Sequence, residues 1–257
     1  MTRLSANLGF LWPELDLLDA IRAAKAAGFE AVETHWPYIT HAVQVAIVLE
    51  ELGMPMVALN TVGGDLAKGE FGLSALPGRE EDARSAIDKA FAYGLDVSAK
   101  YVHVLAGESD NPKARDTFLE NLAYASAKGE EFGVGVLIEP MSLQTRPGCF
   151  LTHVDQAASI IDDLGRDNVF IMFDCFHVQL TEGQLLSRIE ANLDRIGHIQ
   201  IAAVPDRAEP DHGDVDYPEL LRQIDALGYE GFVGAEYRPA GLTSEGLSWM
   251  DSILLSH

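Results

Sequence analysis

The sequence has few cysteines, few basic residues and no long apolar run. Cys149 and Cys175 are the only cysteines among 257 residues, too few for the disulfide framework of a small secreted domain. No apolar run reaches the roughly 18 uninterrupted residues that a membrane-spanning helix needs, and the N-terminus lacks a signal-peptide core. We therefore expect a soluble, cytoplasmic protein with reduced thiols.

Acidic residues outnumber basic ones, with 40 Asp and Glu against 18 Lys and Arg, which gives a formal net charge of −22. A nucleic-acid binder needs a basic face toward phosphates, and docking on an anionic membrane needs the same. We expect neither a nucleic acid nor a membrane among the partners. Hydrophobic residues make up 47% of the chain, which excludes a disordered or fibrous protein.

What the sequence does have is a regular alternation. Short apolar runs rich in β-formers end in polar residues, and each is followed by a segment with helical periodicity. The expected strands are residues 5–10, 31–33, 56–60, 101–105, 135–139, 169–174, 196–201 and 231–236. The expected helices are residues 14–27, 40–52, 80–93, 113–132, 154–164, 182–192, 217–227 and 244–255.

Eight strand–helix pairs predict a parallel sheet closed into a (β/α)₈ TIM barrel. An open doubly wound sheet is the alternative, but Trp12, Pro13 and Glu14 follow the first strand where its phosphate-binding glycines would be expected. No Pro-, Gly- or Ser-rich linker divides the chain, so we expect residues 1–257 to form one domain. Residues 61–79 contain five glycines and a proline and are expected to form a long, functional loop.

Strands five to eight each end on a side chain that carries an oxygen: Glu139, Asp174, Gln200 and Glu236. In a closed barrel the carboxyl ends of the strands surround one mouth, so these four side chains can converge. Three carboxylates at one point repel each other unless a cation neutralises them. An all-oxygen ligand set suits Mg²⁺ or Mn²⁺ rather than structural zinc. The sequence thus predicts a divalent metal site; the alternative is that each acid is solvated or caps the next helix.

Histidines are the next candidates. His177 lies three residues past Asp174, where a loop of the barrel would overhang the site. His103 lies inside the fourth strand and can point into the barrel, although a lone histidine in a strand is more often a core residue. His35 follows the acid Glu33 and can line the mouth.

Arg207 lies in the polar loop after the seventh strand. Its guanidinium can hold a carboxylate or the hydroxyl oxygens of a substrate, and a solvated surface arginine is the alternative. The other histidines, His198 among them, show no ligand spacing. Cys149 and Cys175 have no general base of their own and are expected to be small buried thiols.

Several segments of the chain resemble the hydroxypyruvate isomerase family, within the xylose isomerase-like barrel superfamily. They are LIEPMSLQTRPGCFL, FDCFHVQ, HIQIAAVPDRAEPDHGDVDY and GYEGFVGAEYRP, and the opening ANLGFLWPELDLLDAIRAAKAAGFEAVET fits as well. The resemblance covers nearly the whole chain. Three positions depart from the family pattern: Ser142 stands where Asn is usual, Phe176 where Tyr is usual, and THWPY replaces an apolar run.

The resemblance implies four metal ligands, which are Glu139, Asp174, Gln200 and Glu236. It implies that Glu139 and Glu236 also form an acid/base pair, and that His177 and Arg207 contact substrate oxygens. We keep His103 as a third candidate for substrate binding. The implied cofactor is a divalent ion, Mg²⁺ or Mn²⁺.

The implied reaction is isomerisation of a small keto acid, hydroxypyruvate to tartronate semialdehyde, through an enediolate. A 2-oxo-tetronate isomerase and a ketose 3-epimerase are alternatives that use the same chemistry, and a homo-oligomer is left open. Two other classes are less favoured. A zinc endonuclease of this superfamily would need more histidines and a basic surface, and a non-catalytic sugar-binding relative would be expected to lose one of the acids.

Overall fold

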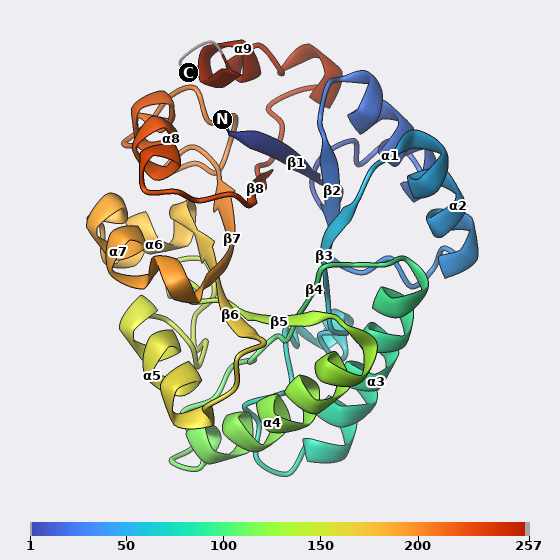
Figure 1. Ribbon diagram of the computed structural model, residues 1–257. Helices are drawn as coiled ribbons and strands as arrows, with labels where there is room; N and C mark the ends of the chain where they lie inside the picture. Colours follow the sequence, from blue (N-terminus) through green and yellow to red (C-terminus); the bar gives the residue numbers. More distant parts are fainter. Residues whose placement is uncertain (1, 255–257) are drawn as a thin grey trace.

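The computed structural model of the protein describes residues 2–254. Its parallel strands form a closed barrel in sequence order, with β1 hydrogen-bonded to both β2 and β8 (Figure 1). The strands are β1 Arg3–Asn7, β2 Ala31–Thr34, β3 Met56–Asn60, β4 Tyr101–His103, β5 Gly135–Ile138, β6 Val169–Asp174, β7 Ile196–Ile201 and β8 Phe232–Ala235. The predicted (β/α)₈ barrel is confirmed, and the open-sheet alternative is wrong because each strand has two partners.

The helices form an outer layer around the barrel (Figure 1). They are α1 Leu17–Ala26, α2 Ala42–Leu52, α3 Glu80–Asp96, α4 Ala114–Phe132, α5 Val154–Leu164, α6 Cys175–Thr181, α7 Leu185–Asn192, α8 Tyr217–Ala226 and α9 Trp249–Leu254. Short 3₁₀ turns cover Leu66–Lys68, Leu193–Arg195 and Thr243–Glu245. Among residues 2–254, none of the helices is long and apolar enough to cross a membrane.

Two apolar clusters fill the fold. The larger one includes Ile21, Phe91 and Phe118, and it packs helices against the outer faces of the strands. The smaller one includes Leu137 and Met172. Side chains alternate along a strand, so a residue two positions after Leu137 or Met172 points to the same side and lies nearer the carboxyl end of the strand. This alternation brings the predicted site residues to the mouth of the barrel.

The structure differs from the expected elements at the first strand, directly after β6 and at the last helix. The first strand ends at Asn7 instead of residue 10, because the Asn7 side chain accepts a hydrogen bond from Gly9 N at 2.9 Å and the chain turns. The helix α6 was not expected. It begins directly after β6, with the Asp174 side chain accepting from Phe176 N at 2.9 Å as its N-cap. The last helix begins at Trp249, and residue 255, its expected end, lies outside the described residues.

Candidate active site

A cavity of about 560 Å³ opens at the carboxyl ends of the strands. Every strand contributes to its lining, either directly or through the residue that follows it: Asn7, Glu33, Asn60, His103, Glu139, Met172, Gln200 and Glu236. Loops that follow the strands add Phe71, Arg146, Arg207 and Arg238 to the wall. The predicted convergence of strand ends at one mouth is therefore present.

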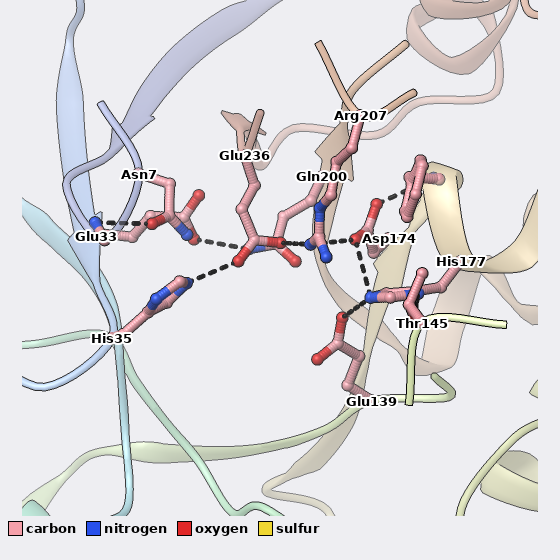
Figure 2. Close-up of polar contacts among 12 residues, drawn as sticks. Asn7, Glu33, His35, Glu139, Thr145, Asp174, His177, Gln200, Arg207 and Glu236 are labelled. Atoms are coloured by element: carbon pink, nitrogen blue, oxygen red, sulfur yellow. Dashed lines mark hydrogen bonds and ion pairs between the residues drawn. The ribbon is translucent and has the colours of Figure 1, made fainter. Parts of the chain in front are cut away.

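Three of the predicted site residues meet on one side of this cavity. His177 Nε2 lies 3.9 Å from Glu139 Oε1 and 3.6 Å from Asp174 Oδ2 (Figure 2). Atoms of all three that can ligate a metal lie within 4.8 Å of one another. Neighbouring ligands around an ion bound at about 2.1 Å are separated by about 3–3.5 Å, which is close to these distances. Glu139, Asp174 and His177 thus form a group that can hold a metal ion.

A second contact of His177 fixes the position of its proton. Ser142 N donates to His177 Nδ1 at 3.2 Å, and because an amide N–H only donates, Nδ1 carries a lone pair. Burial, and then the Arg207 charge, lowers the pKa of His177 to about 3, so the ring is neutral and its proton is on Nε2. This buried Nε2 has no hydrogen-bond partner among the described residues. A free N–H donor favours contact with a substrate oxygen, the predicted role, over metal ligation.

Glu236 follows β8 and has both carboxylate oxygens engaged. Arg207 Nη2 donates to Glu236 Oε2 at 2.9 Å and to Asp174 Oδ2 at 3.1 Å. His35 Nε2 lies 2.7 Å from Glu236 Oε1 (Figure 2). The Arg207 side chain is 14% exposed, so the alternative of a solvated surface arginine is wrong. His35 does more than line the mouth, because it contacts a predicted catalytic residue.

Glu139 and Glu236 have opposite electrostatic surroundings. Burial, followed by the charges of Glu236 and Asp174, raises the pKa of Glu139 well above its ordinary value. Burial also disfavours the ionised form of Glu236, but the Arg207 charge and the His35 hydrogen bond outweigh it and lower the pKa. Two carboxyl groups with pKa values pushed apart suit the roles of acid and base. Glu139 therefore retains a proton under conditions where Glu236 has lost its own.

Next to Gln200 lies a buried pair that spacing did not reveal. Glu33 Oε2 lies 2.8 Å from His198 Nε2 and accepts from Gln200 Nε2 at 3.2 Å. A Cβ at Gly234 would overlap Glu33 Oε1, so β8 needs glycine there. The signal that was missed is the two-residue spacing of His198 and Gln200 on β7, which puts both on the inward face.

The Glu33 carboxylate determines the orientation of the Gln200 side-chain amide. A carboxylate only accepts, so the Gln200 NH₂ must face Glu33 and its Oε1 must face away. Within residues 2–254, the buried Gln200 Oε1 has no hydrogen-bond partner. Gln200 lines the same cavity as Glu139 and Glu236, and its free amide oxygen and their carboxylates are donors of the kind that a hard divalent cation prefers. The residues present therefore fit the predicted ion.

His103 lies at the cavity, as predicted. Its Nδ1 lies 3.3 Å from Asn60 Oδ1, and its Nε2 lies 3.8 Å from Glu139 Oε2. Burial lowers the pKa of His103 to about 3, so this ring is also neutral. All seven predicted site residues are therefore in or beside one cavity, while their individual roles stay predictions.

Comparisons with known proteins agree with the barrel fold. A family model described as xylose isomerase-like TIM barrel matches residues 21–253. The 2-oxo-tetronate isomerase of Cupriavidus necator is 42% identical over 258 residues, which cover 99% of each chain. The putative hydroxypyruvate isomerase of Homo sapiens is 40% identical over 263 residues, covering 97% of this chain and 94% of that one.

A crystal structure named AP endonuclease, family 2, from Brucella melitensis is also similar. It has a TM-score of 0.94 and 38% sequence identity, and the match covers 97% of this chain and 98% of that chain. The resemblance recognised in the sequence is thus confirmed over nearly the full length. The chain belongs to the xylose isomerase-like TIM barrel family.

Proposed function

We propose that this protein is an isomerase of small 3-hydroxy-2-oxo carboxylates. The two relatives compared above are named for 2-oxo-tetronate and hydroxypyruvate, which share a carboxylate, a carbonyl and an adjacent hydroxyl-bearing carbon. The observation that carries the proposal is the pair Glu139 and Glu236, two buried carboxyl groups at one cavity with pKa values shifted in opposite directions. An isomerisation of this kind needs one base and one acid in the same site.

The proposed mechanism is a proton relay between these two residues. Ionised Glu236 removes the proton from the hydroxyl-bearing carbon, and Arg207 and His35 hold its carboxylate in place. Protonated Glu139 delivers a proton to the former carbonyl carbon, and the hydroxyl proton moves to the former carbonyl oxygen. The isomer formed from hydroxypyruvate is tartronate semialdehyde. The neutral Nε2–H of His177 donates to a substrate oxygen as charge develops on it.

We further propose that activity depends on a divalent cation, Mg²⁺ or Mn²⁺. Glu139, Asp174, Gln200 and Glu236 would hold it through oxygen atoms. When bound, the ion supplies positive charge that polarises the substrate carbonyl. Arg207 also donates to Asp174 and Glu236, so it would share these two carboxylates with the ion.

The other function classes have less support. The net charge of −22 opposes the phosphate contacts that a DNA endonuclease needs, although one similar structure carries that name. A non-catalytic sugar-binding role is not favoured, because the buried acids expected for catalysis are all present. A ketose 3-epimerase would use the same acid/base pair on a neutral substrate, so a substrate panel has to include a neutral ketose.

A substrate panel tests the proposal. Hydroxypyruvate, 2-oxo-tetronate, the neutral ketose erythrulose and an abasic-site duplex are each incubated with the enzyme and Mg²⁺ or Mn²⁺, and products are identified by NMR or gel electrophoresis. We expect isomerisation of one or both acids, and its loss in Glu139→Gln and Glu236→Gln. Turnover of the ketose alone would favour the epimerase, and strand cleavage would favour the nuclease.

A further inference from the structure

Arg146 lines the cavity with a side chain that is 30% exposed, and its ion pair within residues 2–254 is a long one. Its partner is Glu108, whose Oε1 lies 3.7 Å from Arg146 Nη1, beyond hydrogen-bond range. Arg146 Nε is buried and donates to no atom of residues 2–254. A buried N–H of a charged group without an acceptor is unfavourable, so this guanidinium is suited to a ligand that brings acceptor oxygens.

Aromatic side chains hold Arg146 at the wall. Its guanidinium lies over the Phe71 ring, 4.0 Å from the ring centroid. Phe71 packs edge-on against Trp36 at a centroid distance of 5.7 Å, and Trp36 lies 5.5 Å from the His35 ring. Phe71 belongs to the glycine-rich loop 61–79 that the sequence marked as functional. Stacking on one face leaves the hydrogen-bonding edge of the guanidinium available.

Arg207 is less suited to bind an anion. Its Nη2 contacts Asp174 and Glu236, so a substrate carboxylate at this guanidinium would approach two carboxylates of the protein and be repelled. Its Nε, which is also buried and has no partner in the described part of the chain, suits a neutral hydroxyl or carbonyl oxygen. The two arginines therefore differ in the substrate oxygen that each can accept.

We propose that Arg146 binds the carboxylate of the substrate and is the residue that selects acids over neutral sugars. This inference rests on the proposed function and names the residue that sets its substrate class. A planar guanidinium can meet both oxygens of a carboxylate at once, which a lysine cannot do. The preceding residue, Thr145, lies 3.3 Å from His177 Nδ1 through its Oγ1, so Arg146 is in the segment next to the reacting groups.

The test compares Arg146→Gln with a matched control, Arg238→Gln. Arg238 lines the same cavity, so both variants remove one positive charge from it. Kinetics are measured on hydroxypyruvate and on dihydroxyacetone, in which CH₂OH replaces the carboxylate. For Arg146→Gln we expect KM for hydroxypyruvate to rise about 10- to 100-fold, with kcat and any dihydroxyacetone turnover little changed. Arg238→Gln should raise the same KM by a smaller factor, which reports the effect of removing one positive charge from the cavity.

A binding measurement makes the result independent of turnover. Calorimetry with glycerate, and with glycerol as its neutral counterpart, gives Kd for each variant. Glycerate affinity should fall about 10- to 100-fold in Arg146→Gln, and glycerol should show no difference. Arg146→Lys keeps the charge and the long stem, so it serves if Arg146→Gln does not fold, and it should recover only part of the affinity.

The outcomes separate this inference from the proposed function. If the wild type isomerises hydroxypyruvate while Arg146→Gln keeps its KM and its glycerate affinity, the assignment of Arg146 is overturned. Equal losses in Arg146→Gln and Arg238→Gln would also overturn it, because they would reflect the total charge of the cavity. If no acid is isomerised but glycerate binding depends on Arg146, the proposed function fails and the carboxylate site stands.

Discussion

A substitution at Gly9 should break the contact between His35 and Glu236 while leaving both of these residues unchanged. A Cβ at Gly9 would overlap the His35 ring, with even Cε1 only 2.6 Å away. Gly9 does not have a positive φ, so alanine fits its backbone. The ring is 17% exposed and has room to swing outward. Gly9→Ala should therefore push His35 off Glu236 Oε1, from which its Nε2 is 2.7 Å away.

The expected loss follows from the strength of that hydrogen bond. A hydrogen bond to a charged group contributes about 1.5–3 kcal/mol. At about 1.4 kcal/mol per tenfold change, kcat/KM should fall about 10- to 150-fold if Glu236 is the base that His35 positions. Thermal stability should change little, because the His35 ring is at the mouth and not in the apolar core.

A double-mutant cycle with His35→Ala is the assay. Gly9→Ala and His35→Ala should cause similar losses, and the double variant should lose no more than either one. Gly241→Ala is the matched control, since a Cβ there meets open space. A further loss from Gly9→Ala in the His35→Ala background would show that Gly9 acts through another contact. Full activity in both single variants would refute a role for His35.

Further predictions rest on the same structure. Chelator treatment should abolish turnover and Mg²⁺ or Mn²⁺ should restore it, whereas full activity in metal-free protein would contradict the ligand assignment. Turnover in D₂O should place deuterium on the carbon next to the carbonyl of the product, whereas an unlabelled product would favour a hydride shift. Glu139→Gln should lower kcat about 10²- to 10⁴-fold. Trp249→Ala should cost about 3–5 kcal/mol of unfolding free energy in denaturant titration, because this 2%-exposed ring packs against Tyr237. Hydrogen bonds to Asp206 and Asp211 raise the pKa of His212 from 6.5 to about 9. At this exposed site the shift should stabilise the folded state by less than about 1 kcal/mol. This stabilisation should be complete below about pH 6.5 and should be lost as the pH rises through about 9. A pH-independent stability difference between wild type and His212→Gln would contradict the last point.

Local patterns in the sequence determined the architecture. The strands Met56–Asn60, Val169–Asp174 and Ile196–Ile201 and the helix Val154–Leu164 have their predicted bounds. Each is an apolar run or an amphipathic segment bounded by residues that end regular structure, so a short window holds the information. Eight such units in alternation were enough to predict a closed barrel. The single domain, the cytoplasmic location and any homo-oligomer stay predictions.

The sequence also determined which side chains reach the mouth. Glu139, Asp174, Gln200 and Glu236 are at or next to the ends of their strands, and barrel closure necessarily brings strand ends together. What the strand pattern did not indicate was α6, a helix too short for periodicity. Its one local signal was Asp174, which the sequence offered both as a ligand and as a cap, and which caps α6 through Oδ1 while Oδ2 contacts Arg207.

The pairings within the site were decided only by the tertiary structure. His35 and Glu236 are 201 residues apart, and Glu33 and His198 are 165 apart, so no spacing along the chain relates them. The orientation of the Gln200 amide and the proton position on His177 likewise depend on neighbours that closure of the barrel supplies. Residue types at strand ends can be read locally, but which atom donates to which depends on distances set by the whole barrel.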